Sequence, residues 1–167
     1  MPGMALDDPN NLLIQNNDAT FSETGLSAGI ASLDRARGAA LADFDGDGLL
    51  DLAVVNRVAP LEVYRNTSQG TGTWVSIDAR QKGTNTRAIG GWIELIDSRG
   101  TQYREITLGG GHAGDISAPQ HFGLDDAKTV SFRVLWPNGT QSDWHEVDTD
   151  QRLRITRDND STVLQSY

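Results

Sequence analysis

The sequence predicts an all-β protein, and three observations support this fold class. No window keeps the i, i+3, i+4, i+7 apolar spacing of an amphipathic helix over a helix length. Glycine is abundant, with 18 residues, and turn-forming residues separate short apolar or alternating runs. Eleven such runs follow one another at close spacing, which is typical of a β-sandwich or barrel and not of βαβ units.

Different sequence patterns indicate the individual strands. Gly38–Ala42 and Leu52–Asn56 are short apolar runs, as in buried strands. Val130–Trp136 alternates cleanly, with Phe132, Val134 and Trp136 on one face. Turns at Ser98-Arg99-Gly100 and Pro137-Asn138-Gly139 separate later runs. The remaining expected strands are Leu12–Gln15, Leu61–Arg65, Trp74–Arg80, Gly91–Ile96, Tyr103–Leu108, Asp143–Val147, Arg152–Thr156 and Thr162–Gln165.

Residues 43–51 read DFDGDGLLD and predict a calcium-binding loop between two strands. Acidic side chains at loop positions 1, 3, 5 and 9 can turn toward one centre, and two glycines allow the tight coiling that this requires. Calcium takes six to eight oxygen ligands. The expected ligands are the carboxylates of Asp43, Asp45, Asp47 and Asp51 and the backbone carbonyl of Leu49.

Two other interpretations of this loop fit the sequence less well. An EF-hand needs a glutamate at loop position 12, where Val54 stands, and it needs flanking helices. A plain acidic turn also collects Asp and Gly. However, four carboxylates within nine residues repel one another unless a cation is bound.

Composition and charge exclude several classes of protein. The chain has no cysteine, so it has no disulfide framework and no thiolate metal site. It contains 14 Lys and Arg and 23 Asp and Glu. The resulting net charge of −9 disfavours nucleic acid as a partner. No apolar run is long enough to span a membrane. The start at Met1-Pro2-Gly3-Met4 lacks the features of a signal peptide, so we expect either a cytoplasmic protein or part of a larger one.

Two segments resemble known families. Asn11–Asn16 and Pro60–Asn66 resemble each other about fifty residues apart, a spacing compatible with propeller blades. Residues 38–66 resemble the FG-GAP (VCBS-type) repeat of integrin-like β-propellers. Residues 74–157 resemble the ASPIC and UnbV domain, which follows such repeats in the cartilage acidic protein family. The motifs that carry the second resemblance are Asn85-Thr86-Arg87-Ala88-Ile89-Gly90, His121-Phe122-Gly123-Leu124 and Val134-Leu135-Trp136-Pro137-Asn138-Gly139.

The resemblance implies a partial propeller segment over residues 1–70, a β-sandwich over 71–158 and a C-terminal tail over 159–167. It also implies bound calcium, an extracellular or periplasmic location, no established enzymatic activity and a chain that is a piece of something longer. Asp125 departs from the family pattern, because glycine usually follows the Phe-Gly-Leu element. The segment Gly109–Asp115 departs as well, so no role of that loop in relatives carries over.

Several other residues are candidates for binding sites. His112, Asp115 and His121 could bind zinc, but their spacing is not one that a helix or tight turn fixes, and His121 is more simply a strand-edge residue. For Asn85 and Arg87 we expect mainly a structural role, in which they fix their loop against a neighbouring strand. Aromatic faces stack on sugar rings, but core packing is the default for tryptophan. Of Trp74, Trp92, Trp136 and Trp144, we expect Trp136 in the core and Trp144 at the surface.

The favoured function is a calcium-binding extracellular recognition or adhesion module without catalysis, with an unidentified protein or glycan ligand. One alternative is a hydrolase or lyase acting on polysaccharide, which needs a concave site with two carboxylates. Another is an orphan fragment with a role in assembly. Because the partial blade leaves strand edges unpaired, we also expect residues 1–66 either to pack on the sandwich or to pair with a second copy of the chain.

Overall fold

The computed structural model describes residues 8–110, 119–158 and 161–167, and the regular structure of these residues is all β-strand. The prediction of an all-β fold is therefore confirmed. The chain divides into two compact units, and each is described by itself. Of the described residues, the first unit takes 8–42, 50–66 and 110, and the second takes 43–49, 67–109, 119–158 and 161–167.

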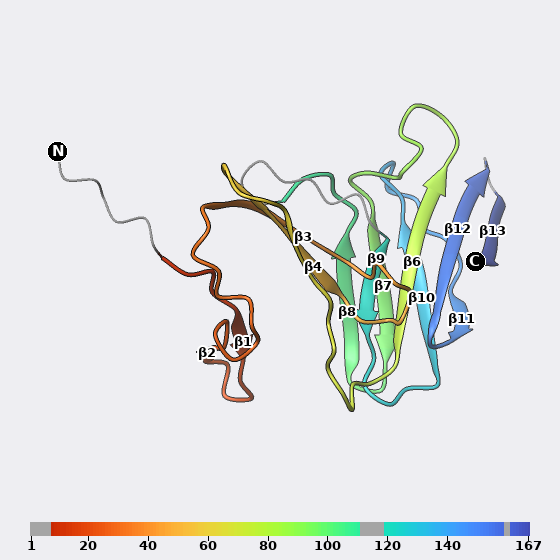
Figure 1. The fold of residues 1–167 in the computed structure, drawn as a ribbon. Helices are drawn as coiled ribbons and strands as arrows, with labels where there is room; N and C mark the ends of the chain where they lie inside the picture. Colours follow the sequence, from red (N-terminus) through yellow and green to blue (C-terminus); the bar gives the residue numbers. More distant parts are fainter. Residues whose placement is uncertain (1–7, 111–118, 159–160) are drawn as a thin grey trace. The chain divides into compact units, whose positions relative to one another are not determined.

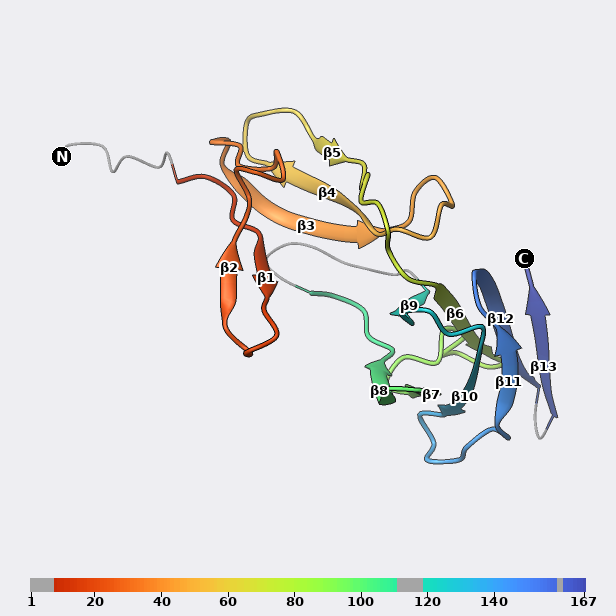
Figure 2. The same cartoon turned by 90° about the horizontal axis from the view of Figure 1, so that it is seen from below.

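The first unit contains two small antiparallel sheets (Figure 1). Strands β1 (Leu13–Gln15) and β2 (Phe21–Glu23) form a hairpin. Strands β3 (Ala36–Ala42), β4 (Asp51–Asn56) and β5 (Glu62–Tyr64) form a three-stranded sheet with β4 in the middle, as Figure 2 shows. This sheet corresponds to the partial propeller blade that the sequence predicts.

The second unit is a β-sandwich of two four-stranded sheets. In one sheet the order is β11-β10-β7-β8, and in the other it is β13-β12-β6-β9. All neighbouring strands are antiparallel except β6 and β12, which run parallel. The strand bounds are β6 Trp74–Gln81, β7 Trp92–Asp97, β8 Gly100–Glu105, β9 Gln120–Gly123, β10 Thr129–Leu135, β11 His145–Asp148, β12 Gln151–Asp158 and β13 Ser161–Ser166.

Both sheets of the sandwich contribute to a single hydrophobic core. Alternate residues of β10 are buried, which places Phe132 and Val134 in the core as their spacing predicts. Trp136 is 3% exposed, so its expected place in the core is confirmed. The opposite sheet supplies Ile77, Phe122 and Ile155, each with no exposed surface. The core gathers residues from strands far apart in the sequence, and this holds the two sheets together.

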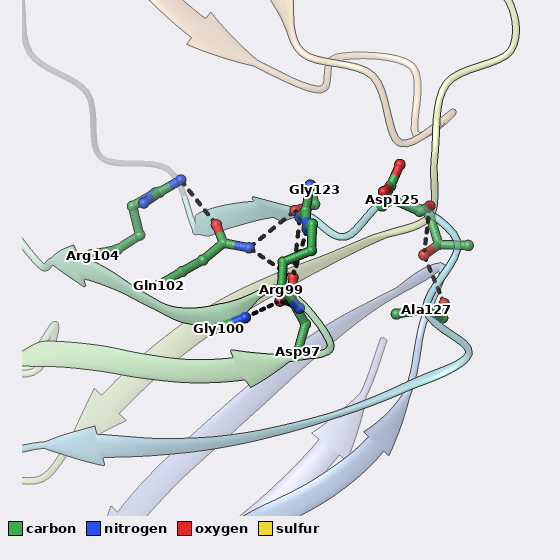
Figure 3. Close-up of polar contacts among 9 residues, drawn as sticks. Asp97, Arg99, Gly100, Gln102, Arg104, Gly123, Asp125 and Ala127 are labelled. Atoms are coloured by element: carbon green, nitrogen blue, oxygen red, sulfur yellow. Dashed lines mark hydrogen bonds and ion pairs between the residues drawn. The ribbon is translucent and has the colours of Figure 1, made fainter. Parts of the chain in front are cut away.

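Asp97 holds two side chains that link the two sheets through hydrogen bonds (Figure 3). Asp97, with only 2% of its side chain exposed, accepts hydrogen bonds from the Arg99 backbone N–H at 2.8 Å and from Gln102 Nε2 at 3.2 Å. Arg99 and Gln102 also donate to the backbone carbonyl of Gly123 in β9. Burial alone raises the pKa of Asp97, but these donors and the Arg99 charge lower it below its ordinary value.

The structure differs from the predicted strand map at three places. Strands β2 and β9 were not predicted. Strand β8 begins at Gly100 and ends at Glu105, three residues earlier than the predicted Tyr103–Leu108. The turn closed by Asp97 causes this shift, because pairing with β7 starts directly after it. The expected strand Thr162–Gln165 is confirmed as β13, which pairs with β12, although the domain division from the sequence counts residues 159–167 as a tail.

Asp125 adopts a backbone conformation that suits glycine. Its φ is +58°, in the left-handed region, at the position where the resembled family usually has glycine. The carbonyl of Asp125 accepts a hydrogen bond from the Thr73 hydroxyl at 3.3 Å. Asp125 therefore occupies a backbone conformation that glycine adopts with less strain.

Candidate metal centre

The acidic loop joins β3 to β4 and brings three of its carboxylates together. One carboxylate oxygen from each of Asp43, Asp45 and Asp51 lies within 4.8 Å of the others. Asp43 follows β3 directly, and Asp51 is the first residue of β4. The two strands pair in register up to Ala42 and Asp51, so the sheet itself fixes the two ends of the loop.

Backbone N–H groups shape the interior of the loop. The N–H groups of Gly46 and Gly48 donate to the two carboxylate oxygens of Asp43, at 2.6 and 3.0 Å. The N–H of Asp47 donates to Asp45 Oδ1 at 3.2 Å. Gly46 and Gly48 have φ of +85° and +88°. Both adopt the left-handed conformation that glycine allows, as the tight coiling of the loop predicts.

Asp51 is anchored at the far end of the loop. It is 2% exposed, and its Oδ1 accepts the backbone N–H of Asn66 at 2.8 Å. The Asn66 side chain in turn donates to the carbonyl of Leu50 at 3.1 Å. A buried carboxylate fixed in this way is a preorganised ligand, because little further ordering is needed when a cation binds.

Two residues of the sandwich contact residues 43–49 of the loop, which belong to the same unit. Arg152 of β12 forms an ion pair with Asp43, with 2.9 Å between Nη2 and Oδ2. A Cβ placed on Gly48 would come within 1.9 Å of Nε1 of Trp74, so only glycine fits there. Burial raises the pKa of Asp43, but the Arg152 guanidinium and the two glycine N–H groups lower it below its ordinary value.

The donor set fits a hard cation. The three grouped ligands are all carboxylates, and all-oxygen donor sets suit Ca²⁺, whereas structural zinc sites are built from imidazole and thiolate ligands. Asp47 is not part of the 4.8 Å group, and its Oδ1 accepts the N–H of Leu49 at 2.9 Å. Ligation by Asp47 and by the Leu49 carbonyl stays a prediction.

The histidine cluster considered from the sequence is described only in part. His112 and Asp115 lie outside the described residues, as does most of the Gly109–Asp115 segment. His121 is in β9, an edge strand of its sheet, and its ring stacks on Trp74 with centroids 5.7 Å apart. Burial and the nearby arginines lower the pKa of His121, although Asp43 acts in the opposite direction.

Asn85, one of the other residues named from the sequence, has a structural role, and two of the tryptophans are partly exposed. The side-chain amide of Asn85 bonds both the N–H and the carbonyl of Ile89 at 2.9 Å, which closes the loop before β7. Trp92 and Trp144 are 41% and 43% exposed, as expected for Trp144.

Sequence reasoning missed a polar cluster on the outer face of the first sandwich sheet. Glu94 accepts hydrogen bonds from Arg133 Nε at 2.6 Å and from the Tyr103 hydroxyl at 2.9 Å. The guanidinium of Arg133 lies over the ring of Trp144, 4.7 Å from its centroid. Glu94, Tyr103 and Arg133 come from three different strands and Trp144 directly precedes a fourth, so the only sequence signal was the outward position of the three strand residues in alternating runs.

Comparison with protein families agrees with this architecture. The family model of the FG-GAP-like repeat matches residues 4–54 and 43–106, which together cover more than half of the chain. The chain belongs to the FG-GAP-like repeat family. The model named ASPIC and UnbV matches residues 81–162, which contain most of the sandwich. Both resemblances inferred from the sequence are confirmed.

Proteins similar to this chain include cartilage acidic protein 1 from three vertebrates. The chain is 28% identical to the mouse protein over 129 residues and 32% identical to the Xenopus tropicalis protein over 109 residues. The human protein is also 28% identical over 129 residues. These matches cover 75%, 63% and 75% of this chain, but only 20%, 17% and 19% of the relatives. The chain thus spans about a fifth of the length of the curated relatives that it matches. Within the described residues, no helix is long and apolar enough to cross a membrane.

Proposed function

We propose that this chain is part of a calcium-stabilised, extracellular recognition module without catalysis of its own. The observation that carries the proposal is the grouping of Asp43, Asp45 and Asp51 within 4.8 Å in a loop whose glycine N–H groups and Arg152 already fix its shape. Calcium would be held by these carboxylates together with Asp47 and the Leu49 carbonyl. The ion neutralises the mutual repulsion of the acids and stiffens the connection between β3 and β4.

The proposed extracellular location follows from the expected affinity of the loop for calcium. A loop of this kind belongs with the extracellular calcium sites, whose Kd is on the order of 0.1–1 mM, so it fills only where calcium is millimolar. The name of the relatives, cartilage acidic protein 1, agrees with a location outside the cell. The segment boundaries at residues 70 and 158 belong to the same proposal, as does pairing of the blade edges β3 and β5 with another chain.

A catalytic role has weaker support. A pocket of about 420 Å³ between β11 and β13 contains two acids, Glu146 and Asp148, and both are exposed. A glycosidase-type general acid needs an environment that raises its pKa, usually by burial. The exposure of these two acids therefore favours the recognition module over the hydrolase or lyase.

Thermal unfolding with and without calcium tests the proposal. The full chain is melted in EDTA and then in millimolar calcium, and light scattering gives the mass of the particle. Calcium is expected to raise the midpoint in the parent and to have no effect in the Asp45→Ala, Asp47→Ala double variant. An equal midpoint for parent and variant in millimolar calcium would mean that the loop is an ordinary turn.

A further inference from the structure

One outer face of the sandwich carries aromatic rings at the two ends of a row of side chains. The row crosses the β11-β10-β7-β8 sheet at right angles to its strands. Arg133 pairs with Glu94 across β10 and β7, and Glu94 pairs with Tyr103 across β7 and β8. Trp144, directly before β11, lies beside Arg133. This row is called the aromatic row, and Trp92 lies on the same face, two residues from Glu94.

Charged and polar contacts hold the rings in place. The hydroxyl of Tyr103 donates to Glu94 Oε1 at 2.9 Å. Arg133 donates to Glu94 Oε2 at 2.6 Å and to Gln141 Oε1 at 2.7 Å, and its guanidinium lies on Trp144. The side chains of Glu94 and Arg133 are only 11% and 26% exposed. Rings fixed by such contacts lose little freedom when a ligand binds, which favours binding.

The rings themselves remain accessible to solvent. Trp92 is 41%, Tyr103 is 51% and Trp144 is 43% exposed. The ends of the row are three strand spacings apart, or roughly 14 Å. Polar groups separate the rings, so the face is not the contiguous apolar patch that a protein partner or a second copy would cover. Alternating apolar and hydrogen-bonding groups match the CH faces and hydroxyls of sugar rings.

The charge of this face selects among glycans. Besides Glu94, the register places Glu105 opposite Trp92, Glu146 opposite Ser131 and Asp148 opposite Thr129, so four carboxylates share the face. Arg133 is the one cation that the register places among them in the described part of this sheet, and it is paired with Glu94. A sulfated or carboxylated chain would be repelled, and a neutral one would not.

We infer that the aromatic row and Trp92 bind a neutral oligosaccharide laid across the strands of this sheet. The inference rests on the proposed function as a recognition module, for which it names the ligand class and the surface. Trp144 and Tyr103 stack on sugar faces at the two ends, and Glu94, Arg133 and Gln141 accept or donate hydrogen bonds to hydroxyl groups between them.

Calorimetric titration of the full chain tests this inference. The probes are β-linked hexasaccharides of glucose, mannose and galactose, with a heparin hexasaccharide as the anionic comparison, in about 2 mM calcium. At least one neutral probe is expected to bind, and heparin is not. Trp144→Ala and Trp92→Ala should each weaken binding about tenfold, which is the loss of one stacked ring.

Tyr167→Ala is the matched control. Tyr167 is 56% exposed and also lies under a guanidinium, that of Arg154, at 4.7 Å, but on the opposite sheet. Its removal should leave binding unchanged. Binding of heparin in place of the neutral probes, no binding of any neutral probe, or an equal loss in Tyr167→Ala would overturn the inference. A drop in particle mass caused by Trp144→Ala would also overturn it, in favour of contact between copies of the chain.

The calcium response of the same samples separates the two proposals. If calcium raises the melting midpoint but no neutral probe binds, the glycan inference fails and the calcium module stands. If a neutral probe binds equally well in EDTA and calcium leaves the midpoint unchanged, the calcium proposal fails and the glycan site stands.

Discussion

Arg152 holds Asp43 at two points. Its Nη2 lies 2.9 Å from the carboxylate Oδ2 and 3.0 Å from the backbone carbonyl oxygen of the same residue. One arginine of β12 therefore fixes both the side chain and the backbone at the start of the loop. It also places a positive charge beside a proposed cation site, where the two charges oppose each other.

Replacing that arginine is expected to tighten calcium binding. Arg152→Gln keeps an N–H donor for the Asp43 carbonyl but removes the charge, and a repulsion of about 1 kcal/mol corresponds to a roughly three- to tenfold lower Kd. Titration of the parent and the variant with calcium measures the change. Weaker binding by the variant would show that Arg152 acts mainly by positioning the loop.

The two loop glycines give a matched pair of substitutions. Both have positive φ, but a Cβ on Gly46 meets no atom nearer than Arg152 Nη2 at 3.8 Å, whereas one on Gly48 meets the Trp74 ring at 1.9 Å. Gly46→Ala should cost about 1–2 kcal/mol of unfolding free energy, and Gly48→Ala roughly 2–5 kcal/mol. Urea unfolding followed by tryptophan fluorescence compares them. Equal costs would mean that the loop does not pack on Trp74.

Asp97 should make the sandwich sensitive to acid. Its pKa is lowered in the folded protein, so it contributes stability above the unfolded pKa of about 3.9, and this contribution is lost as the pH falls through the folded pKa. Asp97→Asn should cost about 1–3 kcal/mol at neutral pH and much less near pH 3. Unfolding free energies at the two pH values measure this, with the exposed Asp126→Asn as control. A cost that does not change with pH would contradict the assignment.

Neighbouring residues of β13 test whether that strand belongs to the sandwich. Leu164 is partly buried against the core, and Val163, on the other face, is 50% exposed. Leu164→Ala should lower the unfolding free energy by about 1–2 kcal/mol, while Val163→Ala should change it by less than about 0.5 kcal/mol. If neither variant changes the thermal midpoint, residues 161–166 behave as a tail after all.

The parts of the fold that sequence predicted best are those whose signal is local. The alternation in β10 and the apolar runs of β3 and β4 are complete within a few residues. Strand β9, by contrast, has one fully buried residue, Phe122, and exists because it pairs with β6 at the edge of the sheet. Strand β2 has only three residues, too few for a period to be recognised.

The same distinction applies to the sites. The acidic loop could be recognised because its proposed ligands lie within nine consecutive residues. The aromatic row could not, because Glu94, Tyr103 and Arg133 come together only through the register of three strands. The parallel pairing of β6 with β12 joins residues more than seventy positions apart, and no pattern in either strand predicts it.

Calcium binding at the acidic loop is the central claim, and backbone amide resonances report on it most directly. Proton–nitrogen correlation spectra of the labelled chain are recorded during titration first with magnesium and then with calcium. The Gly46 and Gly48 amides, which donate to Asp43, should shift with calcium and saturate with a Kd on the order of 0.1–1 mM. Magnesium should produce little change, since it requires a smaller octahedral site. Amides that stay in place throughout the calcium titration, or that shift equally in the Asp45→Ala, Asp47→Ala double variant, would contradict the claim.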